Sequence, residues 1–121
     1  MLTPSTFRWL AIACSIGLFI GCALPGSGLP DMSHGRDKWI HLAGFTPFGL
    51  LWSLAGRRTV WVIAAGFIFG FLIEVYQGVM PIGRSFDFFD ALADTAGTVI
   101  GVAVFWAMQR LKWLPAELVH P

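Results

Sequence analysis

The chain has 121 residues, a formal net charge of +1 and a mean hydropathy of +0.71, and 56% of its residues are hydrophobic. This composition is too apolar for a water-soluble domain of this length, and the small net charge gives no reason to expect a nucleic-acid partner. Cys14 and Cys22 lie in one apolar run. On a helix their positions are about 12 Å apart, so they cannot form a disulfide with each other. We therefore expect a membrane protein.

The first apolar run covers residues 7–24, with Arg8 near its start. About eighteen residues can cross a hydrocarbon core as a helix. The run also has the layout of a signal peptide, but residues 19–22 match a lipoprotein cleavage box poorly, so an uncleaved first helix is the preferred interpretation. A loop rich in proline and glycine follows, reaching to about Arg36.

Three further apolar segments predict an all-α bundle of four transmembrane helices, in a single domain over residues 1–121. Their expected ranges are 38–55, 59–79 and 87–109. Pro47 interrupts the second segment and should bend it, because proline removes a backbone hydrogen bond.

Four spans place the N-terminus, the loop between the second and third spans, and the C-terminus on one side of the membrane. That side carries five basic residues: Arg8, Arg57, Arg58, Arg110 and Lys112. The other side carries three: Arg36, Lys38 and Arg84. The positive-inside rule then predicts that both termini are cytoplasmic. We expect a multi-pass protein of a bacterial inner or plasma membrane, with the turn after the third span facing outward.

Polar side chains gather around that outward turn. A charge inside a bilayer costs from about 2.5 kcal/mol upward, so these side chains need partners or water. Residues three or four positions apart share a helix face, which groups the polar side chains of the second, third and fourth spans. We expect a functional cluster just below the outer surface, formed by Lys38, His41, Glu74, Gln77, Arg84, Asp87, Asp90 and Asp94.

Glycines continue the polar stripes deeper into the membrane. Gly66 and Gly70 follow the stripe of the third span, and Gly97 and Gly101 that of the fourth. Small residues at intervals of four let membrane helices approach closely. We therefore expect these two spans to pack against each other through their glycines.

Several of the polar residues also have a structural interpretation. Asp87 lies where an N-cap of the fourth helix is expected. Asp90 and Asp94 can belong to an ion-paired network that holds the bundle together. His41 is more often a hydrogen-bonded interfacial histidine than a ligand or a base. Glu74 is the hardest to explain structurally, because it lies in an apolar run with no basic residue on its own helix.

The order and spacing of these residues resemble the VanZ-like family over residues 37–108. The resemblance rests on Asp37-Lys38 with His41 and Phe45, on Glu74 with Gln77, on the turn with Pro81, Gly83 and Arg84, on Asp87 with Asp90, and on Asp94-Thr95 with Gly97 and Gly101. Asp94 stands where the family usually has Asn, and Ile82 separates Pro81 from Gly83. The resemblance implies a small multi-span membrane protein, in a family named for a member linked to low-level resistance to the glycopeptide teicoplanin.

The leading interpretation is a non-enzymatic protein, without metal or cofactor, whose cluster binds a membrane lipid, an envelope precursor or a glycopeptide. Arg84, Lys38 and His41 would form its cationic side. A homo-oligomer is compatible with this interpretation.

Two alternatives come from other functional classes. The first is an intramembrane enzyme for phosphoryl or acyl chemistry that holds a divalent cation through His41, Glu74, Asp87 and Asp90. The second is a proton-coupled transporter working through Glu74 and His41. The transporter would need a dimer, because four helices form only a thin pathway.

Overall fold

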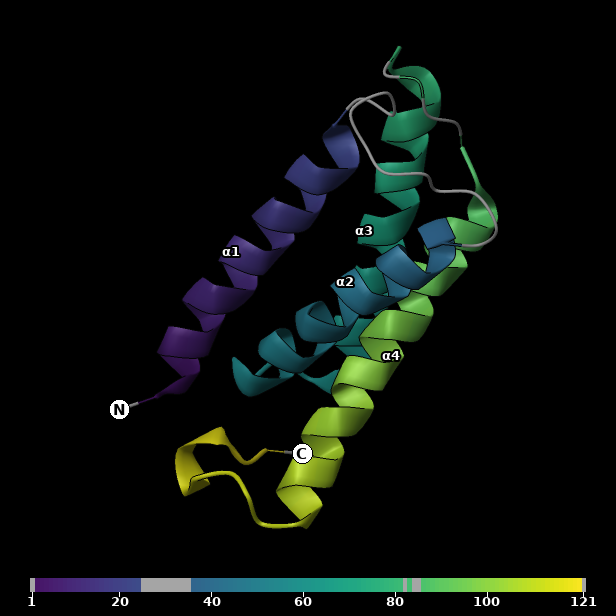
Figure 1. Cartoon of the computed structure of the whole chain (residues 1–121). Coiled ribbons are helices and arrows are strands. Elements are labelled where there is room, and N and C mark those ends of the chain that lie inside the picture. The colour runs from purple at the N-terminus through teal and green to yellow at the C-terminus, as the bar shows by residue number, and fades with distance from the viewer. Residues whose placement is uncertain (1, 25–35, 82, 84–85, 121) are drawn as a thin grey trace.

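The computed structural model describes residues 2–24, 36–81, 83 and 86–120, and these residues form an all-helical structure (Figure 1). Its elements are α1 (Pro4–Ala23), α2 (Arg36–Leu54), α3 (Thr59–Val79), α4 (Phe88–Arg110) and the short 3-10 helix η2 (Ala116–Leu118). No strand occurs within the described ranges. The expected all-α class with four long helices is therefore confirmed.

Three of the helices found in the described residues are long and apolar enough to cross a membrane. These are α1, α3 and α4, with 20, 21 and 23 residues, against the roughly 20 residues that a hydrocarbon core of about 30 Å requires. α2 is of similar length, with 19 residues, but its first turns carry Arg36, Asp37, Lys38 and His41. α2 is thus the more polar helix and brings charge into the bundle at its N-terminal end.

Capping explains where α1 and α4 begin. The Thr3 hydroxyl accepts a hydrogen bond from the Thr6 amide at 3.3 Å, and Pro4 occupies the first turn, where a missing N–H does no harm. α1 therefore starts before the apolar run that predicted it. Asp87 caps α4 by accepting a hydrogen bond from the Phe89 amide at 2.9 Å, as the sequence predicted.

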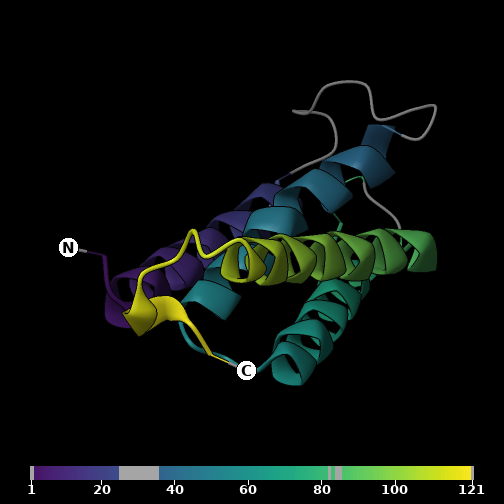
Figure 2. The same cartoon turned by 90° about the horizontal axis from the view of Figure 1, so that it is seen from below.

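α2 is the central helix of the bundle. It contacts each of the other three, most extensively α4. Figures 1 and 2 show α2 crossing α4 at an angle, and the helix continues through Pro47. The N-terminal end of α2 consequently lies beside the start of α4.

Glycines allow α2 and α4 to approach closely. A Cβ atom added to Gly101 would lie 2.6 Å from the amide nitrogen of Leu50, and one added to Gly97 would also meet the backbone of α2. On the opposite side of the contact, a Cβ on Gly49 would lie 3.0 Å from the Cα of Thr98. These are backbone atoms, which cannot move aside as the end of a side chain can. The contact depends on the absence of side chains at these positions.

The expected pairing between the glycines of the third and fourth spans is half wrong. Gly66 and Gly70 of α3 do face α4, but Gly97 and Gly101 of α4 face α2. α4 presents one face to each of two neighbours, and a spacing of four residues defines a face without naming the helix that covers it.

The apolar core has two parts. One contains the buried Phe45, Phe48 and Ile73, against which Phe69 and residues of α1 pack. The other lies at the C-terminal end of α2 and contains Leu54, Phe105 of α4 and Leu118 of η2.

The segment after α4 folds back onto the bundle. Lys112 adopts a left-handed conformation, with φ of 58°, and the chain reverses there. His120 then packs its ring 4.8 Å from that of Phe105, and its Nε2 lies 2.6 Å from the carbonyl oxygen of Ser53. Both ends of the chain consequently lie on the lower side of Figure 1, away from the C-terminal ends of α1 and α3.

Candidate functional site

The polar residues of three helices meet at one end of the bundle. We call Lys38, His41, Glu74, Asp87, Asp90 and Asp94 the polar cluster. The N-terminal part of α2, the C-terminal part of α3 and the start of α4 supply these side chains. His41, Glu74, Asp90 and Asp94 are 6%, 0%, 3% and 0% exposed. Four ionisable residues are therefore buried together in a chain dominated by apolar residues.

Lys38 connects α2 to the start of α4. Its Nζ lies 2.8 Å from Asp87 Oδ2 and 3.2 Å from Asp90 Oδ1. The Lys38 side chain is 43% exposed, so this ion pair forms the outer edge of the cluster. The hydrogen bond from Lys38, helped by that from the Phe89 amide, holds the pKa of Asp87 below its ordinary value.

His41 lies between two carboxylates of α4. Its Nδ1 is 2.7 Å from Asp94 Oδ1, and its Nε2 is 3.8 Å from Asp90 Oδ2. When Asp94 is ionised its carboxylate can only accept hydrogen bonds, and Nδ1 is then the donor. In the neutral imidazole, Nε2 then presents its lone pair toward Asp90.

Glu74 joins α3 to this arrangement. Its Oε2 accepts a hydrogen bond from the Asp87 backbone amide at 3.1 Å, which ties the end of α3 to the cap of α4. Gly70, one turn before Glu74, leaves room for Asp94, because a Cβ there would lie 2.6 Å from Asp94 Oδ2. The glycine lets a carboxylate of α4 lie directly against the backbone of α3.

Three of these residues form a compact set of possible ligands. His41, Glu74 and Asp90 each offer one nitrogen or oxygen atom, and the three atoms lie within 4.8 Å of one another. All three residues are buried. One imidazole and two carboxylates at this separation can hold a cation, or can exchange a proton among themselves.

Not every residue expected in the cluster lies there. Gln77 is buried, but its side-chain amide donates a hydrogen bond to the carbonyl oxygen of Cys22 at 3.0 Å, and so ties α3 to the end of α1. Arg84 lies outside the described residues. The His41–Asp94 pair was not expected, since the sequence suggested basic partners for Asp94. The position of Gly70, one turn before Glu74, was the available signal that α4 comes close to α3 there.

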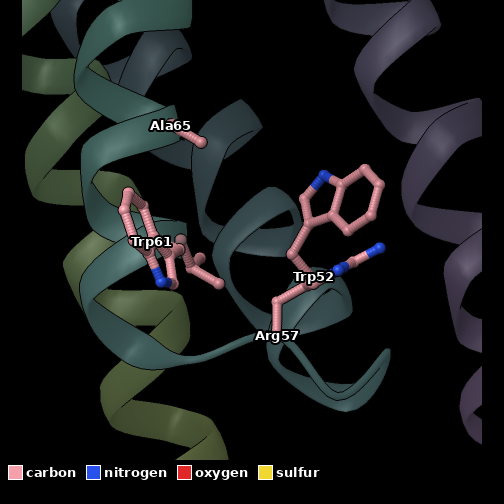
Figure 3. Close-up of a pocket in the computed structure, with 5 residues that line it drawn as sticks. Trp52, Arg57, Trp61 and Ala65 are labelled. Carbon is pink, nitrogen blue, oxygen red and sulfur yellow. The ribbon is translucent and has the colours of Figure 1, made fainter.

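A separate pocket of about 280 Å³ lies at the other end of α2 and α3 (Figure 3). Trp52, Arg57, Trp61, Val62 and Ala65 line it. The side chains of Trp52 and Trp61 lie on either side of it in Figure 3. This lining offers one cation and no carboxylate or histidine, unlike the polar cluster.

Comparison with known proteins supports the resemblance seen in the motifs. A family model described as VanZ/LLP1 matches residues 3–109, which is nearly the whole chain. The match includes α1, whereas the motifs covered only residues 37–108. No curated protein and no solved structure matches the chain.

Proposed function

The chain belongs to the VanZ/LLP1 family, and from this premise we propose that it is a multi-pass cell-membrane protein that binds an envelope ligand through its polar cluster. The ligand we propose is the head group of an anionic lipid or of a lipid-linked envelope precursor. The activity is binding rather than catalysis. A glycopeptide such as teicoplanin is a second ligand class for the same cluster.

The proposed topology has four spans, including α2, with both termini in the cytoplasm. Support comes from the arrangement of the ends, since both termini lie on the same side of the bundle (Figure 1). Arg57, Arg58, Arg110 and Lys112 belong to segments on that side. The polar cluster then lies near the outer surface of the membrane.

The observation that carries the proposal is the burial of His41, Glu74 and Asp90 from three different helices. A charged group in a bilayer costs from about 2.5 kcal/mol upward. Apolar side chains of similar volume would hold the helices together without that cost. Helix packing does not require buried ionisable side chains that converge in this way, whereas a binding site for a polar ligand does.

Lys38 gives the cluster its contact with the membrane surface. Its side chain is more exposed than those of its two ion-pair partners, Asp87 and Asp90, and it lies at the edge of the cluster. A cation at this position suits a phosphate group, because charge-assisted hydrogen bonds to phosphate are among the stronger polar contacts.

The test is native mass spectrometry of the purified full chain, titrated with phosphatidylglycerol and with undecaprenyl phosphate. We expect the unmodified chain to retain these lipids in preference to phosphatidylcholine. Lys38→Met should weaken retention by about tenfold or more, since hydrogen bonds to charged groups contribute about 1.5–3 kcal/mol. Lys112→Met, which removes the same charge at the other end of the bundle, is the matched control and should bind as the unmodified chain does.

Equal weakening by both lysine variants would show general charge attraction and would contradict the proposed site. In cells, Glu74→Gln should abolish any protection against teicoplanin that expression of the chain confers, at an unchanged protein level. Loss of the protein itself would instead indicate that Glu74 serves only the fold.

A further inference from the structure

We infer that His41, Glu74 and Asp90 form a binding site for one transition-metal dication, Zn²⁺ or Mn²⁺. This inference concerns the same polar cluster and rests on the proposed function, which it deepens by naming an ion that the cluster binds. It also bears on the alternative of a metal-dependent reaction, for which a metal site is the first requirement.

The first support is the separation of the three ligand atoms. They lie within 4.8 Å of one another. Ligand atoms bound to one zinc ion at about 2.0–2.2 Å are themselves about 3–3.5 Å apart, so closure around an ion requires movements of about 1 Å. Small side-chain rotations supply such movements without displacing a helix.

The second support is the orientation of His41. Its Nδ1 is engaged by Asp94 at 2.7 Å, and its Nε2 is directed toward the carboxylate of Asp90. Metal-binding histidines commonly donate their second ring N–H to a carboxylate, which sets the tautomer and makes the ligand nitrogen more basic. Asp94 therefore acts as a positioning residue, and His41 is prepared to bind a metal through Nε2.

The third support is the number of carboxylic acids in the described part of the cluster. Glu74, Asp87, Asp90 and Asp94 are set beside the amine of Lys38 and the imidazole of His41. Carboxylate oxygens are ligands for divalent cations. A bound dication would add its positive charge to that of Lys38 in the contact with a phosphate-bearing head group.

The donor set decides between classes of metal. Mg²⁺ and Ca²⁺ are bound mainly by oxygen, whereas imidazole suits zinc and other transition metals. One nitrogen and two carboxylate oxygens therefore favour Zn²⁺ or Mn²⁺. Asp87 is not one of the three ligands, because Lys38 engages its Oδ2 and the Phe89 amide engages its Oδ1. In Asp90, Lys38 engages Oδ1, and Oδ2 faces His41.

The experiment uses the full chain, purified in detergent and treated with a chelator, and titrates it with Zn²⁺ and with Mn²⁺ by calorimetry. We expect one ion per chain. Glu74→Gln keeps the size of the side chain and should lower the affinity at least about 100-fold, since even loss of an outer-shell partner costs roughly 10- to 100-fold. Glu117→Gln makes the same chemical change in the segment after α4 and should leave the affinity within a few-fold.

A second measurement identifies the nitrogen ligand. Spin-echo spectroscopy of the Mn²⁺-loaded protein should show coupling to an imidazole nitrogen, and this coupling should disappear in His41→Ala. Helix content by circular dichroism and elution volume in gel filtration show whether each variant is folded. If His41→Ala does not fold, histidine labelled with ¹⁵N replaces that comparison. The nitrogen coupling of the unmodified chain should then change to that of ¹⁵N, and it should be absent from Glu74→Gln.

Three results would overturn the metal site: no binding by the unmodified chain, equal binding by folded Glu74→Gln, or no nitrogen coupling. The lipid titration of the preceding section separates the two proposals. Lipid retention that depends on Lys38 without any metal would leave the proposed function standing and remove the metal site. Metal binding without lipid retention would leave the metal site standing and remove the proposed lipid binding.

Discussion

At the scale of single residues, the pairing of His41 with Asp94 is the feature that organises the polar cluster. Asp94 stands where the resemblance to the VanZ-like family leads us to expect Asn. Both side chains offer an oxygen that accepts a hydrogen bond from Nδ1, so the orientation of the ring is compatible with either. The carboxylate differs from the amide by adding a negative charge when it is ionised. The departure from the family pattern therefore changes the electrostatics of the cluster more than its geometry.

The Lys38–Asp87 pair predicts a dependence of stability on pH. The pKa of Asp87 is lower in the folded chain than its ordinary value of 3.8, so near that pH the unfolded state binds more protons than the folded state. The stabilisation is therefore fully present above the ordinary value and is lost as the pH falls through the lowered pKa. We expect the difference in thermal midpoint between the unmodified chain and Asp87→Asn to be constant near neutral pH and to shrink below about pH 4.

Lys38→Met serves as the companion variant in that measurement. It removes the main cause of the lowered pKa, so its difference from the unmodified chain should shrink over the same pH range. The effect should be modest, because the side chains of Lys38 and Asp87 are 43% and 35% exposed and water screens the pair. A difference that grows as the pH falls would contradict the assignment.

At the scale of whole elements, the crossing of α2 and α4 decides where the site forms. These two helices share the most extensive contact in the bundle. Glycines on both helices bring the backbones together, and this closeness sets His41 within reach of Asp90 and Asp94. The geometry of the polar cluster is thus a consequence of helix packing one or two turns away.

Gly101→Ala tests this dependence. Its new Cβ would meet the backbone of α2, so we expect a loss of about 1–3 kcal/mol in the free energy of unfolding, as for other overpacked sites. Gly17→Ala is the control: nothing lies within 4 Å of its Cβ position, and it should be neutral or stabilise by up to about 1 kcal/mol. Thermal unfolding in detergent measures both. Equal midpoints for the two variants would refute the close α2–α4 contact.

At the scale of the whole molecule, the bundle separates two chemically different ends. The polar cluster occupies one end. The other end holds the pocket between Trp52 and Trp61, the turn with Arg57 and Arg58 between α2 and α3, and the segment after α4. In a membrane, such a molecule would hold the polar cluster near one surface, and Arg57, Arg58 and the tryptophans of the pocket near the other. The proposed orientation assigns the first surface to the outside.

Cysteine labelling in intact cells tests that orientation. In a chain whose Cys14 and Cys22 have been replaced by alanine, single cysteines are placed at Met80, after α3, and at Trp113, after α4; both positions are exposed. We expect a membrane-impermeant maleimide to label Met80→Cys in intact cells and Trp113→Cys only after permeabilisation. The reverse pattern would place the segment after α4 outside, and labelling of both in intact cells would contradict a membrane crossing by α4.

Sequence reasoning predicted the four long helices and named Lys38, His41, Glu74, Asp87, Asp90 and Asp94, which the structure brings together in the polar cluster. An apolar chain of this length with few charged residues has few alternatives to membrane-length helices, because only internal backbone hydrogen bonding is tolerated in lipid. The capping role of Asp87 also followed, since it depends on the nearest residues alone. Burial of Glu74 could be expected from its apolar neighbours.

The tertiary structure alone decided which residues become partners. Helical spacing defines the face of a helix on which a residue lies, but the crossing of α2 over α4 determines what that face meets. For this reason His41 pairs with Asp94, Gln77 bonds to α1 instead of joining the cluster, and Gly97 packs against α2 and not α3. Such contacts join positions distant in the chain, and local pattern carries no information about the angle at which two helices cross.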